Sequence, residues 1–292
     1  LKFIHLFLIL NQLMMLWIYI KNVVLKRNTS HCKDIELLTV LSVFGRKVIA
    51  LSIIEINKIS KSYDGKTKAI DGLSLQLEAG KICALLGKNG AGKTTTIKIL
   101  MGMLEFDEGD VSILDEKIKK DYPISLKQVI GYVPDSNTLY GYLTGNHYLR
   151  FICGIYRMDY NDISAEIEEY TKLFQMEPYM NKLIHTYSKG TIQKLMMIGE
   201  FIHKPKIMIM DEPFSALDPE IISMVLDLIK QKASEGCTYI ISSHIINLVE
   251  RICDVYLIVK NGKVIAQGET RLIERGKTLE ELYFESVNSS LE

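Results

Sequence analysis

The sequence predicts an α/β fold with a helical insertion. From Ile53 onwards, short runs rich in β-branched and aliphatic residues alternate with longer segments of helical spacing. Several of the short runs are continuously apolar, as expected for strands that are buried on both faces of a sheet. Between about residues 141 and 201 helical patterns dominate, which indicates that the insertion lies there.

The composition is that of a folded protein without a general affinity for nucleic acid. Hydrophobic residues make up 48% of the 292 residues, so the chain can bury a sizeable core. The 35 basic residues equal the 35 acidic ones, whereas a nucleic-acid binder needs a basic surface. We therefore expect no nucleic-acid partner. The five cysteines form no CxxC pair, which argues against a zinc site and favours a reducing compartment.

The first fifty residues differ from the rest of the chain in charge and hydropathy. They hold seven basic and two acidic residues, which leaves 28 basic and 33 acidic residues for 51–292. Phe3 to Ile20 is nearly all apolar, close to the roughly 20 residues that span a bilayer, and three cations follow it. Two interpretations stay open: a membrane segment, or a start-site artefact upstream of the true start. We predict two domains, 1–50 and 51–292.

Within 51–292 the pattern places strands, a helix and a hairpin in order along the chain. Asn261-Gly262 between two apolar runs is a strong hairpin signal. Gly92–Met101 has helical spacing. The predicted strands are Ile53–Ile59, Leu73–Leu77, Ile82–Leu86, Ile130–Val133, Ile207–Asp211, Tyr239–Ser242 and Val255–Val259.

A phosphate-binding loop connects the strand Ile82–Leu86 to the helix that follows. The segment fits the pattern G-x-x-x-x-G-K-[ST] at every fixed position. Glycines let backbone N–H groups point at phosphate oxygens, and the new helix presents its positive end to the same anion. Lys93 would reach the β- and γ-phosphates, and the Thr94 hydroxyl would ligate Mg²⁺. The predicted nucleotide-binding residues here are Gly87, Lys88, Asn89, Gly90, Ala91, Gly92, Lys93, Thr94 and Thr95.

Two carboxylates end the apolar strand Ile207–Asp211. Asp211 would hold the Mg²⁺ shell, and Glu212 would polarise the attacking water as general base. Two solvated acids at a strand end are common in any α/β protein. Together with the phosphate loop, however, they favour a site that hydrolyses a nucleoside triphosphate.

Further segments make the chain resemble the ABC ATPase family over about residues 53–285. Tyr187-Ser188-Lys189-Gly190-Thr191 is similar to the LSGGQ signature, and Ser215-Ala216-Leu217-Asp218 looks like the D-loop. His244 looks like the switch histidine, and Tyr63 like the aromatic residue that stacks on adenine. Within the family, Tyr-Ser-Lys-Gly and Ile-Gly-Tyr-Val-Pro look most like the ATPases of ABC-2 type exporters.

The resemblance implies an architecture, two cofactors and two partners. The expected fold is a P-loop NTPase core with an antiparallel β subdomain and a helical signature subdomain at about 136–190. The expected cofactors are ATP and Mg²⁺. A second ATPase subunit, in a homodimer or heterodimer, would sandwich ATP, with Ser188 and Gly190 of one copy facing the phosphate loop of the other. Glu212, Lys93 and His244 would be the catalytic residues. A membrane-spanning permease would hold the protein at the cytoplasmic face of the membrane and dock near Thr144–Leu149.

Two departures from the family pattern stand out. Lys189 replaces the first glycine of the signature, and Thr191 replaces its glutamine. Asp135 stands where the family has Gln, sometimes Glu, between the metal site and the membrane partner. Asp135 is therefore a third candidate metal ligand beside Thr94 and Asp211, the alternative being a solvated turn residue after proline.

Three functions compete. An ATPase that powers transport, with export suggested by the subfamily likeness, is the reading we prefer. An ABC ATPase that acts on ribosomes or DNA is the alternative, but such proteins usually carry two ATPase units, a long coiled-coil insertion or zinc-binding cysteines. A GTPase or small kinase is disfavoured because Asn181-Lys182-Leu183-Ile184 lacks the acid of the guanine motif and because the signature is present.

Overall fold

The computed structural model describes residues 52–118, 122–135, 139–274 and 276–289, which belong to one compact unit, Leu51–Glu292. The predicted extension 1–50 lies outside the described residues. Within them, no helix is long and apolar enough to cross a membrane.

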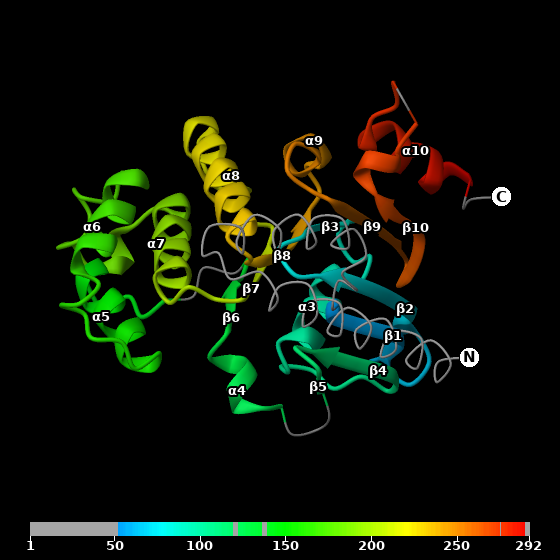
Figure 1. Ribbon diagram of the computed structural model, residues 1–292, viewed down its shortest axis with the longest axis horizontal. Coiled ribbons are helices and arrows are strands. Elements are labelled where there is room, and N and C mark those ends of the chain that lie inside the picture. The colour runs from blue at the N-terminus through cyan, green and yellow to red at the C-terminus, as the bar shows by residue number, and fades with distance from the viewer. Residues whose placement is uncertain (1–51, 119–121, 136–138, 275, 290–292) are drawn as a thin grey trace, which may run out of the picture. The chain divides into compact units, whose positions relative to one another are not determined.

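A six-stranded sheet forms the centre of the unit, in the order β10-β9-β3-β8-β7-β6 (Figure 1). The five neighbouring strands β6, β7, β8, β3 and β9 pair in parallel. Strand β10 lies at the edge of the sheet and forms an antiparallel hairpin with β9. The strands are β3 (Ile82–Leu86), β6 (Ile130–Val133), β7 (Ile207–Asp211), β8 (Thr238–Ser243), β9 (Val255–Lys260) and β10 (Lys263–Glu269). The predicted hairpin is confirmed, since Lys260 pairs with Lys263 and both turn residues have positive φ.

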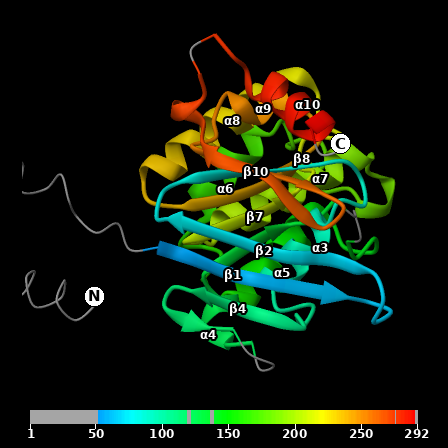
Figure 2. The same cartoon turned by 90° about the vertical axis from the view of Figure 1, so that its right-hand side faces the viewer.

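A second, four-stranded antiparallel sheet has the order β2-β1-β4-β5, and Figure 2 shows β1, β2 and β4 side by side. Its strands are β1 (Ser52–Ser62), β2 (Lys68–Glu78), β4 (Glu108–Ile113) and β5 (Glu116–Lys117). This sheet confirms the antiparallel part of the expected fold. Strands β4 and β5 were not predicted.

Two hydrophobic clusters cover the two faces of the central sheet. Alternate residues of β3 belong to different clusters: Ala84 and Leu86 to one, Cys83 and Leu85 to the other. The first cluster holds residues of α5 to α8, and the second holds residues of α3 and the antiparallel sheet. Burial on both faces explains why the strands of this sheet are continuously apolar.

The helices alternate with the strands along the chain. In Figure 1, α5, α6 and α7 lie together on the side of the sheet where β6 forms the edge. In that group, α7 packs against both α5 and α6. The α-helices are α3 (Lys93–Leu100), α4 (Ile124–Lys127), α5 (Gly145–Ile155), α6 (Ser164–Leu173), α7 (Lys189–Ile202), α8 (Pro219–Ser234), α9 (Ile246–Glu250) and α10 (Leu279–Ser289), and the 3₁₀ turns are Ile184–Thr186 and Thr270–Leu272. The α/β fold class is confirmed.

A buried polar contact joins α7 to β6. Glu200 Oε2 accepts a hydrogen bond of 3.1 Å from the backbone N–H of Tyr132 and lies 3.8 Å from His203 Nδ1. Burial raises the pKa of Glu200 to about 8 and lowers the pKa of His203 to about 4. Both side chains are therefore neutral at pH 7, and their contact is not an ion pair. The His203 ring instead stacks on Tyr156, with 3.7 Å between ring centroids.

Candidate functional site

The backbone angles and the close packing of the phosphate loop require glycine at several of its positions. Gly90 and Gly92 have φ of 80° and 115°, which side-chain-bearing residues rarely adopt. A Cβ on Gly92 would lie 2.7 Å from the carbonyl oxygen of Ala69, and one on Gly87 would lie 2.5 Å from that of Val259. The loop therefore keeps its curl only with glycine at these positions, and α3 begins directly after it.

Lys93 lies inside the curl and is only 5% exposed. Its Nζ donates a hydrogen bond of 2.7 Å to the carbonyl oxygen of Gly87, and it lies 3.2 Å from Glu212 Oε1. A buried ammonium needs such oxygen partners because leaving water is costly for a charge. The predicted phosphate-binding cation and the predicted general base therefore face each other.

The predicted metal ligands Thr94 and Asp211 meet across 117 positions of sequence. Thr94 Oγ1 donates to Asp211 Oδ2 at 2.9 Å, and Asp211 is 2% exposed. A hydroxyl and a carboxylate side by side are the hard oxygen donors that Mg²⁺ prefers, so the pair fits this ion. Ser242, which sequence reasoning missed, donates to Asp211 Oδ1 and fixes the carboxylate from β8. Its only signal was a polar residue at the end of an apolar strand.

Glu212 and His244 are also in direct contact. Glu212 Oε2 lies 2.7 Å from His244 Nδ1, and it accepts a longer bond of 3.3 Å from the His244 backbone N–H. Because an ionised carboxylate only accepts, the Nδ1 nitrogen carries the hydrogen. Glu212 Oε1 accepts no hydrogen bond and faces Lys93. The backbone of Glu212 has φ of 49°, an uncommon value for a non-glycine residue, and Ser242 holds its N–H.

Tyr63 reaches the same site from the end of β1. Its hydroxyl lies 3.3 Å from Thr95 Oγ1, so the predicted adenine-stacking residue and the phosphate loop are neighbours. Its side chain is exposed, at 64%. The ring is thus available to a planar ligand that arrives from solvent.

The signature residues lie at the start of α7. Ser188 is the N-cap, and its Oγ accepts from the backbone N–H of Thr191 at 3.2 Å. A Cβ on Gly190 would lie 2.3 Å from the carbonyl oxygen of Ala216, so the start of α7 packs directly on the loop that follows Glu212. Among the described residues, no hydrogen bond joins Ser188 or Gly190 to the phosphate loop of the same chain.

Asp135 contacts the signature segment. Its Oδ1 lies 3.6 Å from Lys189 Nζ. Within the part of the chain that the structure describes, no hydrogen bond joins Asp135 to Thr94 or Asp211, so its role as a metal ligand stays a prediction.

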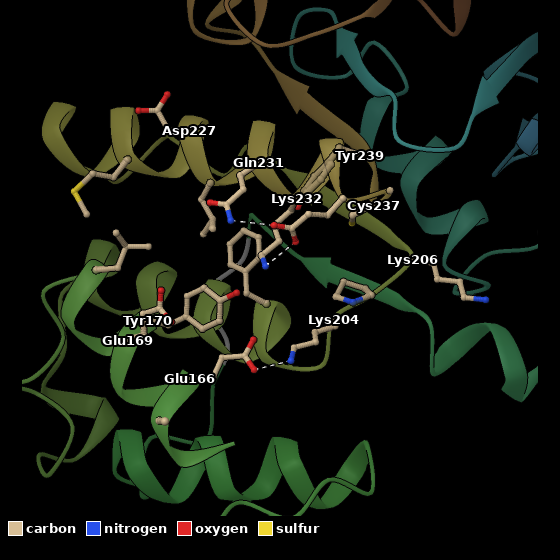
Figure 3. A pocket seen from close by; sticks show the side chains of 18 residues that line it. Glu166, Glu169, Tyr170, Lys204, Lys206, Asp227, Gln231, Lys232, Cys237 and Tyr239 are labelled. Atoms are coloured by element: carbon tan, nitrogen blue, oxygen red, sulfur yellow. Dashed lines mark hydrogen bonds and ion pairs between the residues drawn. The ribbon is translucent and has the colours of Figure 1, made fainter. Parts of the chain in front are cut away.

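A cleft of about 980 Å³ lies elsewhere, between α6 and α8 (Figure 3). Two of the three lysines that line it pair with its own carboxylates: Lys204 with Glu166 at 2.7 Å and Lys232 with Glu235 at 3.0 Å. None of the predicted site residues lines it. The predicted site residues gather instead at the edge of the sheet where β3, β7 and β8 end.

Comparisons with known proteins agree with this geometry. The family model described as ABC transporter matches residues 70–215. The uncharacterized ABC transporter ATP-binding protein YhaQ of Bacillus subtilis is 33% identical, over 76% of this chain and 73% of its own length. The linearmycin resistance ATP-binding protein LnrL of the same organism is 33% identical, over 82% and 77%.

Solved structures show the same fold. A structure described as the ATP binding subunit of an ABC transporter has a TM-score of 0.75 and 30% identity, covering 81% of this chain and 100% of that one. The cbiO1 protein from Clostridium perfringens, described as part of an ABC transporter complex, has a TM-score of 0.67 and 26% identity, covering 82% and 96%. A dimeric bacterial ABC transporter cassette has a TM-score of 0.68 at 23% identity, covering 75% and 99%, and is similar in fold.

Proposed function

The chain belongs to the ABC transporter family as an ATP-binding ATPase subunit, and from this premise we propose that two such subunits hydrolyse Mg²⁺-ATP to power export through a separate permease. The observation that carries the proposal is the convergence of Lys93, Thr94, Asp211, Glu212 and His244. They come from two strand ends and one helix start, yet neighbouring members lie within 2.7 to 3.2 Å of each other.

Binding begins at the phosphate loop. Its N–H groups and the start of α3 attract the phosphates, and Lys93 turns from Gly87 and Glu212 to the β- and γ-phosphates. Thr94 and Asp211 would hold Mg²⁺, which would neutralise charge on the phosphates. The exposed ring of Tyr63 stacks on the adenine.

Departure of Lys93 leaves Glu212 free to act as the base. Its Oε1 then accepts the proton of the attacking water, while His244 holds Oε2 and orients the carboxylate. This role explains why the strained backbone of Glu212 is retained, since that conformation aims the carboxylate at the phosphate loop.

A second subunit completes each site in this proposal. Ser188 and Gly190 sit at the positive end of α7 and, among the described residues, make no hydrogen bond to their own phosphate loop, so they are suited to meet a phosphate held by another copy. The dimeric cassette of similar fold supports this arrangement.

A permease docks on the helical segment in this proposal. Three exposed aromatic side chains gather there: Tyr140 stands 5.9 Å from Tyr142 and 5.6 Å from Phe151, measured between ring centroids. Such a patch is typical of protein contacts. We place the protein at the cytoplasmic face of the membrane on this basis. A relative named for linearmycin resistance supports export.

Copurification of the full chain from solubilised membranes tests the proposal. We expect a membrane-spanning protein to copurify, and the ATPase rate of the reconstituted pair to respond to its substrate. Recovery with ribosomes or DNA instead would overturn it.

A further inference from the structure

The two sequence departures noted above meet in space. Lys189, in place of the first signature glycine, lies 3.6 Å from Asp135, in place of the usual glutamine. Both side chains are more than half exposed, at 57% and 55%. The two residues are far apart in the sequence, since Asp135 follows β6 and Lys189 begins α7, 54 positions later. Their contact therefore depends on how these two elements pack in the fold.

Asp135 lies at the same edge of the sheet as the predicted acidic pair. Strands β6 and β7 pair in parallel, with Val133 opposite Met210, so Asp135 emerges at the sheet edge that also carries Asp211 and Glu212. Lys189 directly follows Ser188, the N-cap of α7. The ion pair therefore connects two parts of the subunit. One is the sheet edge that carries Asp211 and Glu212, and the other is the start of α7, which would contact the nucleotide bound by the partner.

Electrostatics also favour a carboxylate at this place. A cation in the first turn of a helix opposes the helix dipole, and the first turn of α7 contains no acidic residue that would offset Lys189. Asp135 supplies that negative charge from another element. A phosphate group at the same helix start would supply more of it, and would compete with Asp135 for the lysine.

We propose that Asp135 acts as a positioning residue through Lys189: their ion pair holds the start of α7, and the γ-phosphate of ATP competes with Asp135 for the lysine. The inference rests on the proposed dimeric ATPase. It makes Asp135 a competitor for Lys189, which is an alternative to the metal-ligand role predicted from the sequence. Because exposed ion pairs are weak, the contact tunes ATP affinity by a few-fold.

Steady-state kinetics of the full chain test the inference through a double-mutant cycle. Asp135→Asn removes the competitor, so we expect the KM for ATP to fall about 2- to 5-fold, while the Mg²⁺ concentration that the reaction requires stays that of the parent. Lys189→Met removes the lysine, so KM rises, and Lys189→Arg restores it. In the Lys189→Met background, Asp135→Asn has no further effect. High salt shrinks the effect of Asp135→Asn.

Two results would overturn the inference. One is an equal effect of Asp135→Asn with and without Lys189, and the other is a raised Mg²⁺ requirement in Asp135→Asn, which would make Asp135 a metal ligand. Lys172→Met breaks a similarly exposed pair with Glu168 in α6 and serves as the control. Glu212→Gln separates the two proposals: if it hydrolyses ATP normally, the proposed function fails, whereas an additive cycle alone defeats only this inference.

Discussion

At the scale of single residues, the site pairs its buried lysine with its carboxylate. Lys93 and Glu212 lie 3.2 Å apart, and both are shielded from solvent. The charge on each satisfies the other, which lowers the cost of keeping two ionised groups in a confined space. Opening this pair is the first task of the triphosphate.

Glu212→Gln should retain ATP binding and lose turnover by about 100-fold or more, because the amide cannot accept the proton of water. Lys93 also loses its ionic partner in this variant, so dimers should persist with ATP bound. Single-turnover hydrolysis and size-exclusion chromatography measure the two effects. Glu169→Gln, in the exposed part of α6, is the control. A normal rate in Glu212→Gln would remove Glu212 from the role of base.

Lys93→Ala should abolish tight ATP binding. Lys93 is the buried lysine of the phosphate loop in the described part of the chain, and the variant removes its ammonium group. Fluorescent nucleotide titration measures the affinity. Lys98→Ala, on the exposed face of the same helix, should bind as the parent does. Equal affinity in the two variants would contradict the assignment.

At the scale of elements, the joint between α7 and β6 carries a pH dependence. The pKa of Glu200 is about 8 in the folded protein and ordinarily 4.5, so between these values the folded state holds a proton that the unfolded chain has lost. Its contribution to the free energy of unfolding therefore falls as pH rises. His203, with its pKa lowered from 6.5 to about 4, acts in the opposite direction, but only below about pH 6.5.

Stability should therefore decline between pH 6.5 and 8, by up to about 1.4 kcal/mol per pH unit from Glu200. Glu200→Gln should remove this decline, because the amide carries no charge at either pH. Urea unfolding at both pH values measures it, with Glu169→Gln as the exposed control. An unchanged slope in Glu200→Gln would place the pH dependence elsewhere.

Strands buried on both faces were the elements that the sequence predicted best. Ile82–Leu86, Ile130–Val133 and Ile207–Asp211 have the predicted bounds, because a continuous apolar run has few alternatives in a central sheet. β4 was missed because its first half, Glu108-Gly109-Asp110, is polar and exposed. Its place is set by pairing with β1, which is a contact between distant segments.

The same limit applies to the site. The phosphate loop and the acidic pair depend on fixed local spacing, so the sequence alone could predict them. Ser242 and the Asp135–Lys189 contact depend on how β6, β8 and α7 lie relative to one another. Nothing in the local pattern around Asp135 distinguishes a metal ligand from a partner of lysine.

At the scale of the whole molecule, the aromatic patch on the helical segment should decide partner binding. Tyr142→Asp combined with Phe151→Asp should abolish copurification of the membrane protein, because charges replace the apolar contact area. Both side chains are exposed, so the thermal unfolding midpoint should stay near that of the parent. Leu272→Asp changes an exposed apolar residue far along the chain and should keep the partner. Retention of the partner by the double variant would place docking on another surface.

The contact between Gly190 and the carbonyl of Ala216 has a consequence for the proposed dimer. Ala216 stands four residues after Glu212, the base proposed for one nucleotide, and Gly190 belongs to the helix that would cover the other nucleotide. The backbones of Gly190 and Ala216 are in direct contact, with no room for a methyl group between them. A movement of the loop at Ala216 would therefore displace the start of α7. The two ATP molecules would then be consumed in concert, and a dimer with one disabled half would lose more than half of its rate.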